Sequence, residues 1–477
     1  MENNENIRAS KPTRPGGFIQ LIIALLSLAA FAFWLAFSKE LTAPGVVTAA
    51  LSLGLFTLAL IIAVPKAIRF LKNEEPEAAV VLGDRSAKRG VLVHSIRVIL
   101  AVLGARLLVV VAAYIYARVF RGFHGSIFAT MENIWLKTDT DAPHYFSIAE
   151  NWYTKEYPGM YTLVFLPLFP LLIRACNFIF GNSFVSAFVI NTVCTCLGSA
   201  VLYRLVYIDM GRRPAKLSVL FALALPAAIF YVAPMSEALF YMLSVITLFA
   251  LRRRKFWLAA VFGALAAFTR SLGAVLIVPF AAEAIAYASA KRREKEGGIP
   301  GTVIKLVVCG LILLLGTFAY LLINKLLWGD WFKFMEFQRD IWYQRMAPFF
   351  GTVSTQTNQL IYGADTETVL GLWLPNLLYI FGALAVLIFS ARTLRTPYFL
   401  YFAAYFAVAC GASWLLSAPR YLTALVSIPI ALAHLCQGRA DGVATGRAKA
   451  KATAVTVIFI VCQALYLLMY VMEYKIY

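Results

Sequence analysis

Charged residues are scarce in this chain. Only 14% of its 477 residues are Asp, Glu, Lys or Arg, whereas soluble domains carry about 25%. Hydrophobic residues make up 61% of the chain, and the mean hydropathy is +0.77. Apolar runs of about 20 residues, the length that spans a bilayer as one helix, recur from end to end. The sequence therefore excludes a soluble globular protein and predicts an all-α, polytopic integral membrane protein.

Paired metal or redox motifs are also missing. The seven cysteines lie in or beside apolar segments and none forms a C-x-x-C pair, so neither a disulfide framework nor a zinc site is indicated. The sequence has no P-loop and no G-x-G-x-x-G fingerprint, and it indicates no nucleotide site. No cofactor is indicated either. Asp141 and His144 could join on a divalent metal, but such a pair is too small a set to predict one.

The net charge of +19 would suggest a nucleic-acid partner in a soluble protein. Here the basic residues sit in short loops between apolar runs, so the tendency of such loops to stay in the cytoplasm explains them better. Some of them could also hold anionic lipid headgroups. We therefore expect membrane lipids as partners and no nucleic acid.

Placing every basic loop in the cytoplasm orients the helices. The charged linker 65–97 becomes cytoplasmic, so the next helix runs outward and delivers the acid-richer loop 120–157 to the external face. This arrangement predicts about 13 transmembrane helices and a cytoplasmic N-terminus. The expected crossings are 17–38, 43–64, 98–119, 184–207, 217–233, 235–251, two within 256–289 that turn near Arg270, 303–327, 370–391, 398–416, 419–436 and 453–473.

The stretch 165–181 is apolar, yet we expect it not to cross the membrane. Pro167 and Pro170 lie three residues apart within it and disrupt helix hydrogen bonding. A crossing here would also move the basic cluster after residue 211 to the outside. The chain closes on YKIY without a signal for retrieval to the endoplasmic reticulum, which favours a bacterial plasma membrane.

One polar stretch, Trp135–Tyr153, interrupts the apolar sequence. It reads WLKTDTDAPHYFSIAENWY and holds two aspartates, a histidine and a glutamate, namely Asp139, Asp141, His144 and Glu150. From Pro143 onward it predicts a short amphipathic helix, with Tyr145, Ile148 and Ala149 on one face. Such a helix suits a membrane surface better than a membrane core. We expect the other polar groups of the chain to converge on this loop.

The predicted topology brings further polar side chains to the same external face, namely Glu237, Arg270, Gln338, Trp342 and Arg420. Charged groups at membrane depth cost roughly 2.5–3.5 kcal/mol each to insert, so they are functional candidates. Group transfer from a lipid phosphate to a hydroxyl needs a base for the acceptor proton and a cation for the leaving phosphate. Carboxylates and arginines beneath a surface helix fit that chemistry.

Six motifs now carry a resemblance to the PIG-V-type mannosyltransferases. The motifs are DAPHYFSIA (141–149), FLPLFPLLIR (165–174), PMSEALF (234–240), AAFTRSLGAVLIVP (266–279), GDWFKFMEFQRDIW (329–342) and APRYL (418–422). They follow the family order, although Thr140 stands where the family has Trp, and Met235-Ser236 stands where it has Tyr-Thr. The resemblance implies a GT-C-type fold, a polyprenyl-phosphate-linked mannose donor and inversion at the anomeric carbon.

The resemblance also implies roles for single residues. Asp141 becomes the general base, although its place before Pro143 also suits a helix N-cap. Asp139 is the second candidate base, with a solvated loop acid as the alternative. Arg420, with Arg270, would hold the donor phosphate, and the alternative is that both snorkel to the interface.

The remaining candidates would contact sugar or acceptor. Glu237 either does so or caps the following helix, and Gln338 and Trp342, four residues apart, would share one helix face. His144 could orient Asp141, and Tyr145 follows it in the same motif. No metal ligand set is predicted.

The sequence thus predicts two parts, a two-helix membrane extension with a cytoplasmic linker (1–96) and a GT-C-type transmembrane glycosyltransferase domain (97–477). The expected enzyme moves a sugar, with mannose as the expected one, from a polyprenyl-phosphate donor to a hydroxyl of a lipid-linked or cell-envelope glycan on the external face. The alternative is a lipid or solute transporter or flippase without transferase activity. A transporter commonly has an internal repeat and charges near the bilayer midplane.

Overall fold

The computed structural model is helical throughout the part of the chain that it describes, with one isolated β-bridge between Met346 and Ala412. The described residues are 16–38, 41–74, 85–136, 140–157, 159–294, 297–363, 365–437 and 445–476, with only the backbone for 85–93. Asp139, the second candidate base, lies outside the described residues.

Eight helical stretches in the described residues are long and apolar enough to cross a membrane. Six of them are single helices: α1 (Gly17–Phe37), α2 (Ala43–Leu71), α3 (Arg85–Arg121), α7 (Ser183–Met210), α12 (Ile299–Trp328) and α20 (Gly446–Val471). Two are compound: a 3₁₀ turn η3 (Ser271–Leu276) leads into α11 (Ile277–Arg293), and α15 (Thr366–Thr368) and a π-helical turn η4 (Val369–Trp373) lead into α16 (Leu374–Ser390). These spans confirm the polytopic, all-α membrane fold, and the count of 13 crossings stays a prediction.

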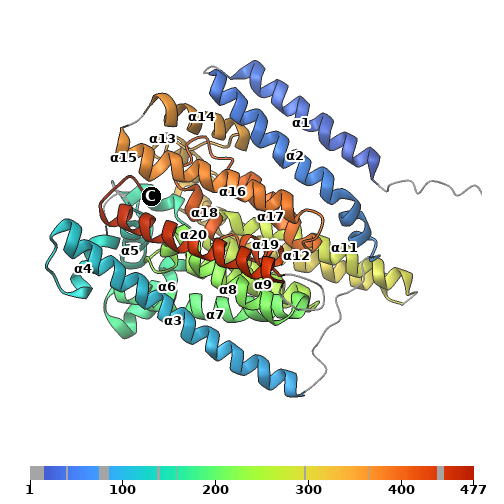
Figure 1. Cartoon of the computed structure of the whole chain (residues 1–477), viewed down its shortest axis with the longest axis horizontal. Helices are drawn as coiled ribbons and strands as arrows, with labels where there is room; N and C mark the ends of the chain where they lie inside the picture. Colours follow the sequence, from blue (N-terminus) through green and yellow to red (C-terminus); the bar gives the residue numbers. More distant parts are fainter. Residues whose placement is uncertain are drawn as a thin grey trace, which may run out of the picture.

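Shorter helices complete the bundle. They are α8 (Arg212–Ala224), the 3₁₀ helix η2 (Pro226–Tyr231), α9 (Glu237–Arg252), α10 (Phe256–Thr269), α14 (Phe349–Tyr362), α17 (Thr396–Ala409), α18 (Ala418–Thr423) and α19 (Ser427–Leu435). The longer ones among them, such as α9 and α17, run beside the long helices in the middle of the molecule (Figure 1).

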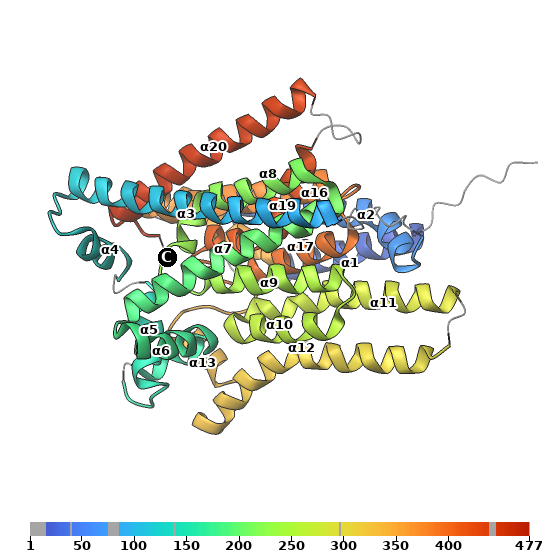
Figure 2. The ribbon, with the colours of Figure 1, turned by 90° about the horizontal axis from the view of Figure 1, so that it is seen from below.

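Five further helices lie near one end of this bundle, where the C-terminus also lies. They are α4 (Ile127–Trp135), α5 (Ala142–Asn151), the 3₁₀ helix η1 (Gly159–Val164), α6 (Leu168–Phe180) and α13 (Lys333–Asp340). Figures 1 and 2 both show α4, α5 and α13 at this end. α6 has 13 residues, about 20 Å of helix, which is short for a hydrocarbon core of about 30 Å. That length agrees with the prediction that 165–181 does not cross.

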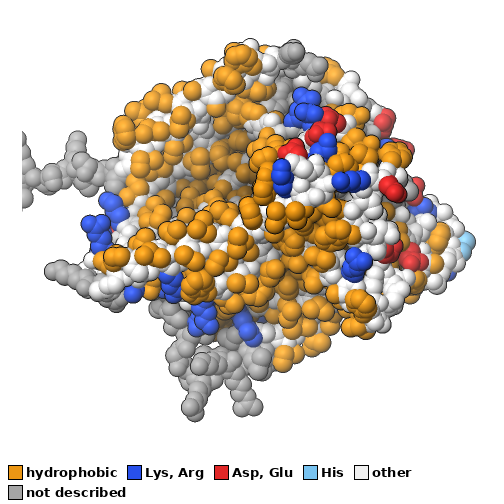
Figure 3. Space-filling model, turned by 180° about the vertical axis from the view of Figure 1, so that it is seen from behind, with side chains coloured by type: hydrophobic (Ala, Val, Ile, Leu, Met, Phe, Trp, Pro, Cys, Tyr) orange, Lys and Arg blue, Asp and Glu red, His pale blue; other side chains and the backbone are white. Residues whose placement is uncertain are grey.

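The surface of the bundle is largely apolar. Figure 3 shows hydrophobic side chains over most of one face, with the acidic side chains gathered near one end. Large hydrophobic side chains stand far out of the protein, for example Phe178 (91% exposed), Leu326 (75%) and Phe18 (75%). Apolar surface on this scale would be unstable against water and is stable against lipid tails.

Three predicted crossings differ from the observed helices. The expected helix 217–233 ends at Ala224, because Pro226 cannot continue it and starts η2 instead. The expected helix 398–416 ends at Ala409, and residues 411–413 instead pair with the backbone of 345–347. The expected helix 419–436 is broken between α18 and α19.

Other boundaries agree with the sequence. The predicted turn near Arg270 is confirmed, since Arg270 is an extended residue between α10 and η3. α2 continues past Pro65 to Leu71, into the stretch expected to be linker.

Helices α10 and α12 approach each other closely at Gly316. A Cβ atom added there would lie 1.9 Å from the carbonyl oxygen of Ala264 and 2.9 Å from the backbone nitrogen of Phe268. Small residues at such crossings allow two membrane helices to pack backbone against backbone. The position therefore requires glycine.

Candidate active site

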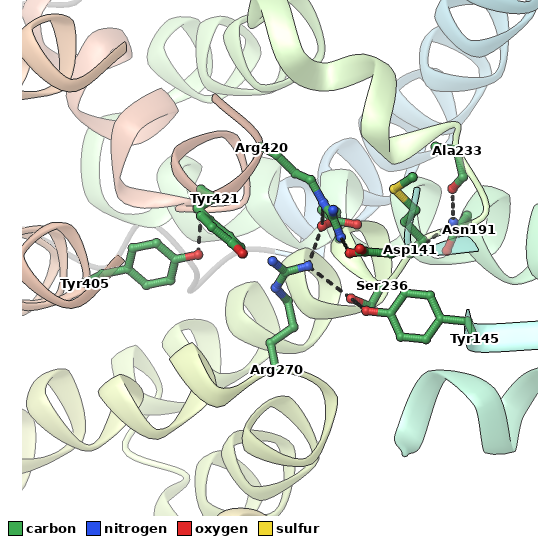
Figure 4. A network of polar contacts seen from close by, with 11 residues as sticks. Asp141, Tyr145, Asn191, Ala233, Ser236, Arg270, Tyr405, Arg420 and Tyr421 are labelled. Atoms are coloured by element: carbon green, nitrogen blue, oxygen red, sulfur yellow. Dashed lines mark hydrogen bonds and ion pairs between the residues drawn. The ribbon is translucent and has the colours of Figure 1, made fainter. Parts of the chain in front are cut away.

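Four charged side chains from distant parts of the sequence meet at one place, which we name the ion-pair cluster. Its members are Asp141, Glu237, Arg270 and Arg420. Two carboxylates and two guanidinium groups give it a formal charge of zero. Figure 4 shows three of them, Asp141, Arg270 and Arg420, drawn together from helices of different colours.

Arg420 is at the centre of the ion-pair cluster. Its Nε donates to Glu237 Oε1 and its Nη2 donates to Asp141 Oδ2. The short helix α18 positions it, with Pro419 in the first turn. The side chain is 4% exposed, and its guanidinium carbon lies 5.6 Å from the centre of the Phe230 ring. Arg420 is thus a buried cation held by two carboxylates rather than a residue that snorkels to the interface.

Glu237 is the deepest carboxylate, at 1% exposure. It is the first residue of α9, where a negative charge is favoured by the helix dipole. Its Oε1 accepts from both Arg270 and Arg420. Its second oxygen, Oε2, is buried without a hydrogen-bond partner among the described residues. The carboxylate therefore holds both arginines in place, which is more than a helix cap.

Arg270 lies at the break between α10 and η3. Its Nη1 bonds Glu237 and also donates to Ser236 Oγ at 3.1 Å. Its guanidinium carbon lies 5.1 Å from the centre of the Tyr421 ring. At Gly273, a Cβ atom would lie 2.3 Å from backbone atoms of Ala266 and Ala267. The tight turn that positions Arg270 thus depends on a glycine three residues later.

Asp141 is the most accessible member of the ion-pair cluster, with 25% of its side chain exposed. It occupies the N-cap position of α5, and its backbone oxygen accepts from Tyr145 N at 3.1 Å. Its side chain makes no capping hydrogen bond and is directed to Arg420 instead. The N-cap alternative is therefore wrong for the side chain, although the position itself is the N-cap.

The predicted amphipathic helix is confirmed as α5. Its buried residues include Tyr145, Ile148 and Ala149, the three that the sequence placed on one face. The Tyr145 hydroxyl lies 2.9 Å from Ser236 Oγ, which joins α5 to the turn before α9. Burial raises the pKa of the Tyr145 hydroxyl well above its usual range, so the phenol stays protonated.

His144 and Trp342 form an aromatic group beside Asp141. The His144 ring lies over Phe165, with centroids 4.9 Å apart, and meets Trp342 edge to face at 5.5 Å. Burial lowers the pKa of His144 from 6.5, and the nearby Asp141 carboxylate opposes that shift. The described residues contain no group of three His, Cys, Asp or Glu side chains that could hold a metal ion.

Gln338 and Trp342 do not share a helix face, so that expectation is wrong. α13 ends at Asp340, before Trp342. Gln338 Nε2 donates at 2.6 Å to Oε1 of Gln344, which lies in the loop that follows the helix. Trp342 instead packs against His144 and Phe165. Glu150, the other acid of α5's polar stretch, is exposed and accepts from Ser183 Oγ at 2.6 Å.

The segment between α8 and α9 is held by residues that we did not single out from the sequence. Asn191 of α7 donates to the backbone oxygens of Ala233 and Met235. Arg106 of α3 donates through Nη1 to the backbone oxygen of Tyr231. Freed backbone groups inside a membrane protein need such partners, and this segment leads directly into Glu237.

Arg106 is itself unusual because it is 5% exposed within an apolar span. Its Nε and Nη2 atoms are buried without hydrogen-bond partners in the described part of the chain. The sequence alone could have singled out Arg106, because a charged residue in the middle of an apolar run is a functional candidate by default. Asn191 carried no comparable signal, because one amide in a helix is common.

The fold and the ion-pair cluster define an integral membrane protein with a buried group of paired charges near one end of its bundle. Comparison with known families matches residues 166–315, less than a third of the chain, to the family described as dolichyl-phosphate-mannose-protein mannosyltransferase. The matched stretch contains Glu237 and Arg270 and reaches neither Asp141 nor Arg420. A comparison with curated proteins finds no match.

Among solved structures, the chain is similar to ArnT from Cupriavidus metallidurans bound to undecaprenyl phosphate. The alignment covers 73% of this chain and 75% of that chain, with 14% sequence identity and a TM-score of 0.36. A TM-score of this size does not establish a common fold. The PIG-V-type resemblance stays a prediction, because the family model that matches is a different one.

Proposed function

We propose that this chain is a membrane glycosyltransferase of GT-C type. It moves a sugar, with mannose as the expected one, from a polyprenyl-phosphate donor to a hydroxyl of a lipid-linked or cell-envelope glycan. The reaction takes place on the external face of a bacterial plasma membrane, and it inverts the anomeric carbon. The observation that supports this proposal best is the ion-pair cluster, in which an accessible carboxylate is paired with one of two buried arginines at the start of an amphipathic helix.

The donor class has independent support from the family match. The family's name describes transfer of mannose from a dolichyl phosphate, and its model covers residues 166–315. That stretch includes the apolar helix α7 and two members of the ion-pair cluster, Glu237 and Arg270. The name also specifies protein as acceptor, so the acceptor is the part of the proposal that an experiment must decide.

Asp141 is the proposed general base. It takes the proton of the acceptor hydroxyl while that oxygen attacks the anomeric carbon from the side opposite the phosphate. The bond between the anomeric carbon and the phosphate oxygen breaks, and both of its electrons leave with the phosphate. The exposed quarter of the Asp141 side chain supports this role, because a base must reach the proton that it removes.

Arg420 and Arg270 are the proposed phosphate ligands. In this structure Arg420 uses Nε and Nη2 on the two carboxylates, and a phosphate would compete with Asp141 for the guanidinium. Guanidinium groups suit phosphate because two N–H groups can bond two oxygens at once. Charge on the leaving phosphate grows as the sugar bond breaks, so a positioned cation stabilises the transition state.

Glu237 orients the two arginines in this proposal, and its Oε2 could still accept from a sugar hydroxyl as first predicted. His144 and Trp342 pack edge to face, and the buried Tyr145 holds Ser236 through its hydroxyl; contacts of these three residues to sugar or acceptor belong to the proposal. Gln338 of α13 bonds Gln344 in the loop that follows the helix, and its contact to sugar or acceptor remains a proposal.

The deciding experiment is incubation of the purified protein with radiolabelled polyprenyl-phosphate mannose and a membrane extract. The extract is split into lipid, glycan and protein fractions before the label is traced. We expect label in a lipid or glycan product, with none when Asp141→Asn protein is used. The matched control is Glu150→Gln, an exposed acid on the same helix α5 that lies outside the ion-pair cluster.

Two results would overturn the proposal. One is label that stays on the donor in every fraction, which would favour the transporter or flippase alternative. The other is equal transfer by wild type and Asp141→Asn. Label found in the protein fraction would keep the enzyme class and replace the glycan acceptor by a protein.

A further inference from the structure

A groove runs along the lipid-facing side of the bundle, away from the ion-pair cluster. It lies between α3, α7, α8 and α20 and has a volume of about 600 Å³. Figure 2 shows α20 running obliquely to α3 and α8, with its first turns standing away from the bundle. The volume falls within the range of about 300–1,000 Å³ that ligand sites commonly have.

One face of α3 forms the floor of the groove. The lining residues of this helix recur at three- and four-residue spacing from His94 to Ala112. This stripe is about 27 Å long at 1.5 Å per residue. After its first turn the stripe is entirely apolar, so its length and its polarity suit a hydrocarbon chain.

Among the described residues that line the groove, Arg and Lys side chains lie at one end only. Arg97 stands in the first turn of the α3 stripe, and Lys216 stands in the first turns of α8. Both side chains are exposed. Beyond Lys216 the groove residues of α8 are apolar up to Ala224. Both walls therefore change from basic to apolar in the same direction.

The other end of the groove is closed by the second half of α20. Ile460, Ala464 and Leu467 line it there, and Gln463 donates to the backbone oxygens of Leu223 and Leu225. These bonds use the Nε2 group of Gln463 within the protein, so its N–H donors do not need a ligand. Apart from Gln463, the lining residues of this end are apolar.

We propose that the groove is a binding site for one anionic phospholipid. Its phosphate lies between Arg97 and Lys216, and one acyl chain runs along α3 toward Leu467. Basic groups between transmembrane helices hold anionic headgroups in this way. The site is separate from the proposed donor site, because α3 and α8 both begin at the end of the bundle away from α5. It does not depend on the proposed function.

The test is lipid retention measured by native mass spectrometry on the full-length protein. The protein is prepared in nanodiscs that contain phosphatidylglycerol and phosphatidylcholine with identical acyl chains, and then released. We expect one phosphatidylglycerol per chain to be retained. Neutralising both cations in Arg97→Gln/Lys216→Gln should reduce the preference for phosphatidylglycerol by about 30-fold, since each basic residue near an anionic lipid contributes about fivefold.

A second variant tests the apolar part of the groove separately. Ala105→Phe fills the groove and leaves both cations in place, so it should lower retention of both lipids alike. The matched control is Lys305→Gln, an exposed cation on α12 that is not part of the groove. It should retain lipid as wild type does.

Thermal unfolding in detergent, with and without added phosphatidylglycerol, gives an independent reading. Wild type and Lys305→Gln should gain stability on addition, and the two groove variants should not. Equal retention of both lipids by wild type, or a loss in Lys305→Gln as large as in the double variant, would overturn the proposal. Displacement of phosphatidylglycerol by an equal concentration of polyprenyl phosphate would also overturn it, because the occupant would then be a different lipid.

Discussion

Asp141 combines two conditions that few residues of this chain share, a paired charge and an accessible side chain. Arg420 holds one of its oxygens, while a quarter of the side chain is exposed. A carboxylate in this position can serve as a base, and it also competes with a phosphate for the same arginine. The two effects predict opposite changes in turnover and in donor affinity.

Asp141→Asn should therefore lower turnover by about 10²- to 10⁴-fold, the usual contribution of general-base assistance. Donor affinity should not fall, because the amide competes with phosphate for Arg420 less strongly than a carboxylate does. Turnover and the donor Kd, measured in one detergent, give both values. Asp139→Asn should be much milder. Full activity of Asp141→Asn would remove this residue from the chemistry.

Arg420→Lys tests whether geometry matters beyond charge. The guanidinium bonds Glu237 through Nε and Asp141 through Nη2, and one ammonium cannot reproduce that planar arrangement. We expect slower transfer and weaker donor binding in the lysine variant, and a further loss in Arg420→Ala. A lysine variant with unchanged turnover and unchanged donor Kd would leave Arg270 as the remaining phosphate ligand.

The pKa of His144 reports on the charge of Asp141 and on the burial of the imidazole. Burial lowers its pKa from 6.5, and the Asp141 carboxylate raises it. The folded state thus favours neutral imidazole. As the pH falls below about 6.5, the unfolded chain takes up a proton at this histidine before the folded chain does. Acidification therefore lowers the free energy of unfolding. NMR of histidine-labelled protein should show His144 titrating below 6.5. Asp141→Asn should shift that pKa further down, and an upward shift would contradict the observed arrangement.

At the scale of elements, the packing of α10 against α12 depends on one glycine. Gly316→Ala would place a Cβ atom within 2 Å of the Ala264 carbonyl oxygen, where neither backbone can yield easily. Overpacking of this kind destabilises by about 1–3 kcal/mol. Gly310→Ala on the same helix meets only side-chain atoms of Phe280, at 3.5 Å, and Ile277, at 3.7 Å, which is ordinary contact, and it is the matched control. A lower Tm should follow from the first substitution only.

The sequence predicted uninterrupted helices better than interrupted ones. α1, α7 and α12 were placed within a few residues, because about 20 apolar residues in a row leave little choice in a bilayer. The breaks after Ala224 and Ala409 were not predicted. Hydropathy does not predict where a helix ends inside the protein. The end of α17, for example, depends on hydrogen bonds between residues 411–413 and the backbone of 345–347.

The candidate site was predictable in its charged residues and not in its supports. The motifs and the topology together brought Asp141, Glu237, Arg270 and Arg420 to one region. The contacts that fix the segment before Glu237 come from Arg106 and Asn191 on other helices. Such contacts depend on how helices rotate and tilt against each other, which spacing along one helix does not determine.

At the scale of the whole molecule, the orientation in the membrane can be measured at two positions. α7 separates Gly181 from Arg212, and we expect the first on the external side and the second in the cytoplasm. Single cysteines at these positions, in a background without the seven native ones, should react with a membrane-impermeant thiol reagent from opposite sides. Labelling of position 181 from the cytoplasm would reverse or refute the topology.

The ion-pair cluster also has a consequence for how the chain is made. Glu237 and Arg270 are 33 residues apart and leave the ribosome together, whereas Arg420 follows Glu237 by 183 residues and Asp141 by 279. At about 5–20 residues per second, Asp141 waits on the order of 14–56 s for its partner. Until α18 is made, this carboxylate lacks its cation, so a nascent chain stopped before residue 420 carries an uncompensated acid at the membrane. We expect quality-control proteases to recognise that intermediate. The charge of Asp141, in the first third of the chain, is neutralised only when Arg420, in the last third, has been made.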